Sequence, residues 1–210
     1  MSNCVRVSHV REALANGVPL VLRPTGQRAA VAIIVRDLAT GAEVLLIERS
    51  RRADDPWSGH IAFPGGRREP GDADDLSTAI RETREEIGLD LTRQAHLLGR
   101  LDEIGAVARG RALDMVIVPF VFELAEPSRL CTSAEVSDVF WTPLGPLLSG
   151  EARTTYRFEW DGQVTEHPAF RVRNRTVWGL TQRMLSCLVG ALASSAAREP
   201  TVGSEGNGRD

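Results

Sequence analysis

Three glutamates near the middle of the chain have the residue type and the spacing of a metal site. Glu82, Glu85 and Glu86 lie at i, i+3 and i+4, so a helix would present them as neighbours on one surface. At about 5–6 Å and an effective dielectric near 20, each like-charged pair would repel by roughly 3 kcal/mol. A divalent cation reverses the sign of this interaction, and carboxylate oxygens on a rigid helix suit Mg²⁺ or Mn²⁺. The alternative is a solvated acidic helix face that binds nothing.

The surrounding residues predict the helix that would position these glutamates. Apolar residues recur every three or four positions from Leu76 to Ile87, which leaves the glutamates on the other face. Asp74 or Asp75 can cap the start of the helix, and Gly88 can end it. Arg81 lies four residues before one of the glutamates and can hold that carboxylate in place.

The stretch from Gly66 to Leu89 resembles the Nudix box, whose pattern is G-x5-E-x7-R-E-U-x-E-E-x-G-U, where U is aliphatic. The second half of the pattern matches from Arg81 onward, with Thr83 at a position that is usually aliphatic. The first half departs from the pattern in two ways: Asp72 replaces the first glutamate, and one extra residue separates it from the arginine.

The resemblance implies hydrolysis of a nucleoside diphosphate that is linked to another group, with a divalent metal and water. Metal ions polarise phosphoryl oxygens, lower the pKa of bound water and orient its attack. By position in the box, the expected ligands of Mg²⁺ or Mn²⁺ are Glu82, Glu85, Glu86 and the carbonyl of Gly66. Glycine lets the backbone approach a metal or a phosphate closely, so Gly65 is expected to contact the substrate.

The resemblance also implies catalytic roles. Arg81, Glu85 and Glu86 are expected to take part in catalysis. Some Nudix proteins carry their general base on an acidic loop that precedes a late strand, and Glu135 is the candidate here. Otherwise Glu85 or Glu86, beside the metal, would activate the water. A general base must lie within hydrogen-bond reach of that water, which a sequence does not show.

A second pattern, ahead of the box, is similar to the Nudix subgroup that hydrolyses coenzyme A, L-L-T-x-R-S-x3-R-x3-G-x3-F-P-G-G. The chain carries the leucine pair at 45–46, Arg-Ser at 49–50, Gly59 and F-P-G-G at 63–66. Ile47 replaces the threonine, the inner arginine is missing, and the window is one residue longer.

The loop within this pattern offers candidate substrate contacts. Arg49, Arg51 and Arg52 can grip phosphates, including the 3′-phosphate of coenzyme A, and the alternative is a solvated loop. Trp57 can stack on an adenine or cover the core.

Together these resemblances imply hydrolysis of coenzyme A or an acyl-coenzyme A to 3′,5′-ADP and a phosphopantetheine. Alternatives with the same chemistry are ADP-ribose, a dinucleotide or a modified nucleoside triphosphate as substrate. A non-catalytic Nudix-fold binding module is another class, and the intact glutamates argue against it. An isopentenyl diphosphate isomerase would need a pocket cysteine, which neither Cys131 nor Cys187 matches.

Composition narrows the remaining possibilities. Hydrophobic residues make up 42% and charged residues 25%, as in soluble globular proteins. A net charge of −3 gives no support to a nucleic-acid partner. Three widely spaced cysteines form neither a disulfide framework nor a zinc pattern, so a reducing cytoplasmic location is expected. No signal peptide or membrane span is expected, so neither is a membrane partner. A homodimer is left open.

The fold predicted by periodicity is an α/β or α+β domain over residues 1–195, and the resemblance implies a Nudix-type α/β/α sandwich with a mixed sheet. Strands are expected at 29–35, 43–47 and 115–124, where Pro119 indicates an edge, a bulge or a strand end. A second hairpin is expected at 154–170 around Asp161-Gly162. Helices are expected at about 8–16 and 177–194, a loop over the site at 107–114, and a disordered tail at 196–210.

Overall fold

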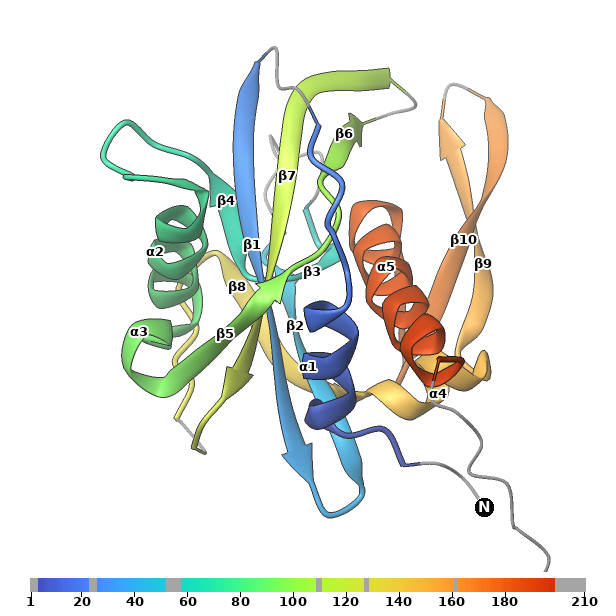
Figure 1. Ribbon diagram of the computed structural model, residues 1–210. Helices are drawn as coiled ribbons and strands as arrows, with labels where there is room; N and C mark the ends of the chain where they lie inside the picture. The colour runs from blue at the N-terminus through green and yellow to red at the C-terminus, as the bar shows by residue number, and fades with distance from the viewer. Residues whose placement is uncertain are drawn as a thin grey trace, which may run out of the picture.

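The protein is an α/β/α sandwich built on a mixed sheet (Figure 1). The computed structural model describes residues 4–22, 26–51, 58–108, 111–126, 129–160 and 162–198. The helices are α1 (Val7–Ala15), α2 (Asp75–Ile87), α3 (Leu91–Gln94), α4 (Leu144–Ser149) and α5 (Gly179–Ala196). The strands are β1 (Gln27–Leu38), β2 (Gly41–Arg49), β3 (Ile61–Ala62), β4 (Gly65–Arg67), β5 (Ala95–Arg100), β6 (Ile104–Ala108), β7 (Arg111–Leu124), β8 (Val136–Pro143), β9 (Arg153–Trp160), β10 (Gln163–Val172) and β11 (Arg175–Trp178).

The β1–β2 hairpin opens into a fork that holds the glycine loop. The two strands pair with each other only near their turn, from Val35↔Val44 to Leu38↔Gly41. Farther from the turn, β1 pairs with β4 and β2 pairs with β3. Because β7 occupies the other edge of β1 and β8 the other edge of β2, residues 61–67 must fill the gap between the hairpin strands. The fold thereby fixes the loop from both sides.

Helices cover both faces of the main sheet, so successive strand residues are buried on opposite sides. Ile33 joins the core under α1 and α5, whereas Ile34 joins the core under α2. Leu46 and Leu45 divide in the same way on β2. Figure 1 shows α2 on one side of the sheet and α1 with α5 on the other, which confirms the predicted layers.

The strands expected at 29–35 and 43–47 pair as a first hairpin, and the expected second hairpin is confirmed. The first turns at Ala39–Thr40 and the second joins β9 to β10. The second hairpin belongs to a separate three-stranded sheet with the order β11-β10-β9. This sheet stands beside α5 and away from α2 (Figure 1).

Several boundaries differ from those expected. The last helix begins at Gly179 and not at Val177, because Val177 and Trp178 pair with β10 as strand β11. The first helix spans 7–15 and not 8–16. The predicted loop at 107–114 is wrong, because β6 and β7 occupy most of it. The predicted disordered tail lies largely outside the described residues.

Pro119 sits inside β7 at a change of partner strand. The neighbouring strand is β6 up to Ile117 and β5 from Phe120 onward. The missing N–H of Pro119 therefore falls where no ladder bond is required, while its carbonyl accepts from the Leu101 N–H at 2.9 Å.

In the described part of the chain, no helix combines the length and the apolar character needed to cross a membrane.

Candidate active site

Helix α2 carries the three glutamates, and its ends are set by local capping. The Asp74 carboxylate accepts from the Ser77 N–H at 2.7 Å, which identifies Asp74 rather than Asp75 as the cap. Gly88 ends the helix in the left-handed conformation with φ 69°, and its N–H bonds the Arg84 carbonyl. Both predicted ends are confirmed.

The glycine loop lies directly against this helix. Gly65 has φ 151°, and a Cβ there would come within 2.3 Å of the Ala30 carbonyl on β1. A Cβ on Gly66 would come within 2.4 Å of a Glu82 carboxylate oxygen. Gly65 thus allows the loop to approach the sheet closely, and Gly66 allows the loop to approach the Glu82 carboxylate.

Arg81 organises one side of the carboxylate cluster. Its Nε and Nη2 each lie 2.9 Å from an Asp72 carboxylate oxygen. Its Nη1 donates to both Glu82 and Glu85 at 3.0 Å. The ion pair lowers the pKa of Asp72 well below its usual range, and Asp72 in turn raises the pKa of Arg81. Asp72 therefore anchors the arginine that holds two of the glutamates, despite the extra residue in the box.

Glu86 is buried, which corrects the prediction that all three glutamates occupy the polar face. It is 3% exposed, while the Glu85 side chain is 58% exposed. One carboxylate oxygen accepts from the Gly65 N–H at 2.9 Å, and the other lies 3.9 Å from Arg49 Nη1. Burial outweighs these contacts and raises the pKa of Glu86 to about 7, and burial also raises the pKa of Glu82.

The remaining candidates lie at different distances from the cluster. Arg49 lies beside Glu86, whereas Arg51 is exposed. Glu135 is exposed on the loop before β8, and its charge contributes to the raised pKa of Glu86. The backbone carbonyl of Glu135 accepts from the Ser50 N–H at 2.8 Å, which ties this loop to the end of β2. Arg52 and Trp57 lie outside the described residues.

The donor set fits a hard divalent cation, although the side chains are turned toward protein partners. Over the described ranges, no three His, Cys, Asp or Glu side chains converge tightly enough to bind a metal ion as they stand. The reason is visible in the contacts: Arg81 holds Glu82 and Glu85, and Gly65 holds Glu86. Glu82 and Glu86 are partly or fully buried, have raised pKa values and lie beside the glycine backbone. A bound cation would stabilise the ionised form of both carboxylates.

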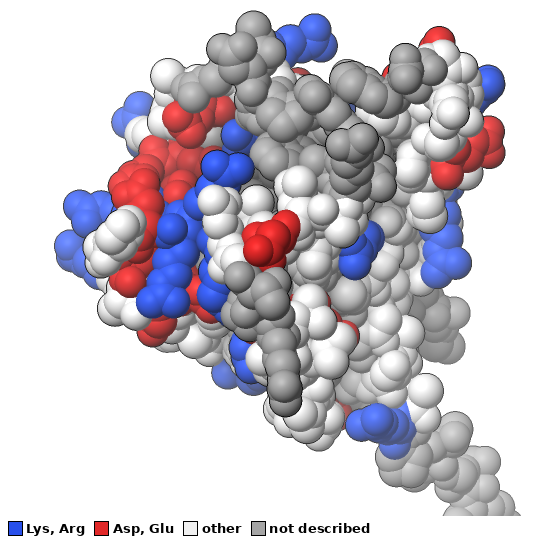
Figure 2. Space-filling view, turned by 90° about the horizontal axis from the view of Figure 1, so that it is seen from above, with Lys and Arg blue, Asp and Glu red and all other residues white. Residues whose placement is uncertain are grey.

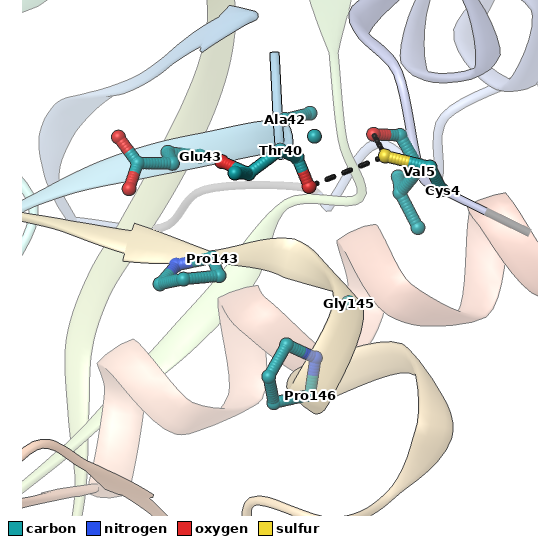
Figure 3. Close-up of a pocket in the computed structure, with 9 residues that line it drawn as sticks. Cys4, Val5, Thr40, Ala42, Glu43, Pro143, Gly145 and Pro146 are labelled. Carbon is teal, nitrogen blue, oxygen red and sulfur yellow. Dashed lines mark hydrogen bonds between the residues drawn. The ribbon is translucent and has the colours of Figure 1, made fainter. Parts of the chain in front are cut away.

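Charge is concentrated on the α2 side of the molecule. Figure 2 shows acidic and basic side chains lying against one another there. A cavity of about 210 Å³ lies elsewhere, near the β1–β2 turn, and is lined partly by Cys4, Thr40 and Pro146 (Figure 3). The Cys4 thiol donates to the Thr40 carbonyl there. This hollow is at the closed end of the hairpin, whereas the glycine loop lies in the fork.

Sequence reasoning missed the residues that fix the start of α2. Arg28 on β1 donates to Asp75 at 2.8 Å and to Glu103 at 2.9 Å. The side chain of Glu103 is 1% exposed and also accepts from the Leu22 N–H. These partners are far apart in the chain, so no local pattern indicates them.

A helix with this carboxylate cluster, packed against a glycine loop in a forked hairpin, defines the Nudix class of protein. The sequence matches the NUDIX domain over residues 26–160. The chain belongs to the Nudix hydrolase family.

The chain is similar to two curated proteins and to one solved structure. The chain is 32% identical over 169 residues to human mitochondrial coenzyme A diphosphatase NUDT8, covering 80% of this chain and 70% of that protein. It is 37% identical over 158 residues to an uncharacterised Schizosaccharomyces pombe protein, covering 74% of this chain and 45% of that protein's length. The crystal structure of a MutT/nudix family protein from Enterococcus faecalis superposes with a TM-score of 0.52 at 16% identity, covering 87% of this chain and 66% of that one, and supports the fold.

Proposed function

We propose that the protein hydrolyses the diphosphate linkage of coenzyme A or an acyl-coenzyme A, with Mg²⁺ or Mn²⁺, to give 3′,5′-ADP and a 4′-phosphopantetheine. The main support for coenzyme A as the substrate is the 32% identity with human coenzyme A diphosphatase over 80% of the chain. The Arg49-Ser50 and F-P-G-G segments support it, because the fork brings Arg49 next to the buried Glu86 carboxylate, which also accepts from the Gly65 N–H.

The residues have defined tasks in this proposal. Glu82, Glu85, Glu86 and the Gly66 carbonyl would hold the metal, which supplies charge neutralisation at the diphosphate and an acidified water. Arg81, anchored by Asp72, orients Glu82 and Glu85.

Contacts to substrate and water complete the proposal. Arg49 and the Gly65 backbone contact the diphosphate, with Arg51, Arg52 and Trp57 as further predicted contacts. Glu135 takes the proton of the attacking water, and Glu86 or Glu85, beside the metal, is the alternative base.

A product panel tests the substrate. Coenzyme A, acetyl-coenzyme A, ADP-ribose, NADH, a diadenosine polyphosphate and several nucleoside triphosphates are incubated with Mg²⁺ or Mn²⁺, and the products are identified by mass. We expect 3′,5′-ADP from coenzyme A to exceed all other products. Faster cleavage of ADP-ribose, a dinucleotide or a triphosphate would reject coenzyme A, and no cleavage would favour a nucleotide-binding module.

The compartment and assembly remain predictions. The three cysteines are free thiols, in keeping with the expected reducing cytoplasm, while the human relative is named a mitochondrial protein. The proposed partner is the small-molecule substrate, and a homodimer is testable by light scattering.

A further inference from the structure

A group of aromatic rings on the small sheet has no role in the chemistry above. Trp178 lies at its centre, with the Tyr156 ring stacked on it at a centroid distance of 4.4 Å and an interplanar angle of 25°. The rings of Phe158, His167 and His60 lie 5.3, 5.7 and 5.1 Å from Trp178. We call these five residues the ring cluster.

The β9–β10–β11 register places four of these rings on one face. Tyr156 is directly opposite His167, and Phe158 is two residues farther along β9. Trp178 is opposite Ala169, two residues from His167. Because side chains alternate along a strand, all four point to the same side of the sheet.

The two faces of this sheet differ in character. The face opposite to the rings is exposed toward the β9–β10 turn, with Val164 at 50% exposure and the Arg157–Glu166 pair, and is buried toward β11, with Phe170 and Val177 in the core. The ring cluster is only half-buried, whereas the neighbouring Val177 is 0% exposed. A patch of half-buried rings is more accessible than the adjoining core, and it carries polar edges from a phenol and two imidazoles.

The ring cluster adjoins the candidate active site through His60. The His60 carbonyl accepts from the Arg49 N–H at 3.0 Å, and the Arg49 side chain lies 3.9 Å from Glu86. His60 also leads directly into β3 and the glycine loop, and Thr181 at the start of α5 donates to the Ile61 carbonyl at 2.9 Å. Arg49 therefore links the two sites: its side chain lies near the buried Glu86 carboxylate, and its backbone is hydrogen-bonded to His60 of the ring cluster.

We propose that the ring cluster is the binding platform for the nucleobase of the substrate, with Tyr156 and Phe158 as the stacking residues. Aromatic side chains bind a base through its π-face, which is worth about 1–3 kcal/mol per base, or roughly 5- to 150-fold in affinity. The imidazoles and the phenol can bond the polar edge of the base. This inference rests on the proposed function in that it takes a nucleotide diphosphate as the ligand.

Calorimetric titration with ADP and with inorganic pyrophosphate, both in Mg²⁺, isolates the contribution of the adenosine. We expect the wild-type protein to bind ADP about tenfold or more tightly than pyrophosphate. Tyr156→Leu and Phe158→Leu should each reduce this ratio by about fivefold or more, with pyrophosphate affinity unchanged. Tyr156→Phe, which keeps the ring, and Val164→Ala, on the opposite face of the same sheet, should retain the wild-type ratio.

Three outcomes would overturn the inference. An unchanged ratio in both leucine variants would make the rings a packing cluster. Equal weakening of both ligands, with a lower melting temperature, would show that the rings support the fold. Weaker binding of 4′-phosphopantetheine with unchanged ADP binding would assign the rings to the other half of coenzyme A. Failure to cleave coenzyme A would reject the proposed function, yet the ADP-to-pyrophosphate ratio would still test the platform.

Discussion

Replacing Glu86 with glutamine is expected to stabilise the metal-free protein while abolishing its activity. The carboxylate is 3% exposed, and burial raises its pKa from 4.5 to about 7. Between these two values the unfolded chain has already lost the proton that the folded protein retains. Folding stability therefore falls as pH rises from 4.5 to about 7, and the full penalty is present above that range.

The size of the penalty follows from the two pKa values. Their difference corresponds to about 3 kcal/mol at pH 8 and to less than about 1 kcal/mol at pH 5. Glutamine removes the charge and keeps an oxygen that can accept from the Gly65 N–H. Its amide N–H groups reduce the gain, so about 3 kcal/mol is an upper bound. For a domain of this size that is a rise of at most about 6–12 °C in melting temperature.

Calorimetric unfolding in EDTA at pH 8 and pH 5 measures this effect. Glu85→Gln is the matched control, because it changes the neighbouring carboxylate at 58% side-chain exposure and should shift stability by less than about 1 kcal/mol. Added Mg²⁺ should raise the melting temperature of the wild type and have a much smaller effect on Glu86→Gln. The reasoning would be refuted if Glu86→Gln melted at a lower temperature than the wild type at pH 8. It would also be refuted if the difference in melting temperature between variant and wild type were the same at both pH values.

Three further substitutions test the rest of the site. Gly66→Ala places a Cβ within 2.4 Å of the Glu82 carboxylate, so kcat/KM should fall about tenfold or more with an unchanged circular dichroism spectrum; near-normal activity would contradict the close approach. Asp72→Asn weakens the anchor of Arg81. Because the pKa of Asp72 is depressed, the stability that its carboxylate contributes is present above pH 3.8 and declines as the pH falls. The substitution should therefore lower the melting temperature more at pH 7 than at pH 3, and an equal loss at both pH values would count against the ion pair. Glu135→Gln should lower kcat by about 10²–10⁴-fold if Glu135 is the base, and a change below about threefold would transfer that role to Glu86 or Glu85.

Local chemistry explains what the sequence predicted correctly. The cap at Asp74 and the end at Gly88 depend on residues within one helical turn, so their types and spacing suffice. The ion pair of Arg81 with Glu85 is likewise an i, i+4 contact. The two hairpins follow from strand patterns on either side of a short turn.

Contacts between distant segments explain what the sequence did not show. Periodicity assigns Glu86 to the polar face of α2, yet position 86 borders the buried Thr83 and Ile87, and the glycine loop in the hairpin fork covers it. Residues 177–178 precede a glycine and a long apolar helix, so they read as its beginning, but pairing with β10 makes them strand. The alternation of Tyr156 and Phe158 along β9 is visible in the sequence, whereas their meeting with Trp178, which also contacts His60, requires the fold.

The contacts around α2 also indicate where a cation would gain most. Arg81, which Asp72 holds in a fixed orientation, compensates the exposed Glu85 but only partly offsets the burial of Glu82. Glu86 has one backbone N–H and a distant guanidinium, which do not offset its burial. Compensation is therefore strongest at the exposed end of the cluster and weakest at the buried end. A divalent ion between Glu82, Glu86 and the Gly66 carbonyl would supply charge where the protein itself does not. Loss of Glu86 should accordingly weaken Mg²⁺ binding more than loss of Glu85, which calorimetric titration of the two glutamine variants can compare directly.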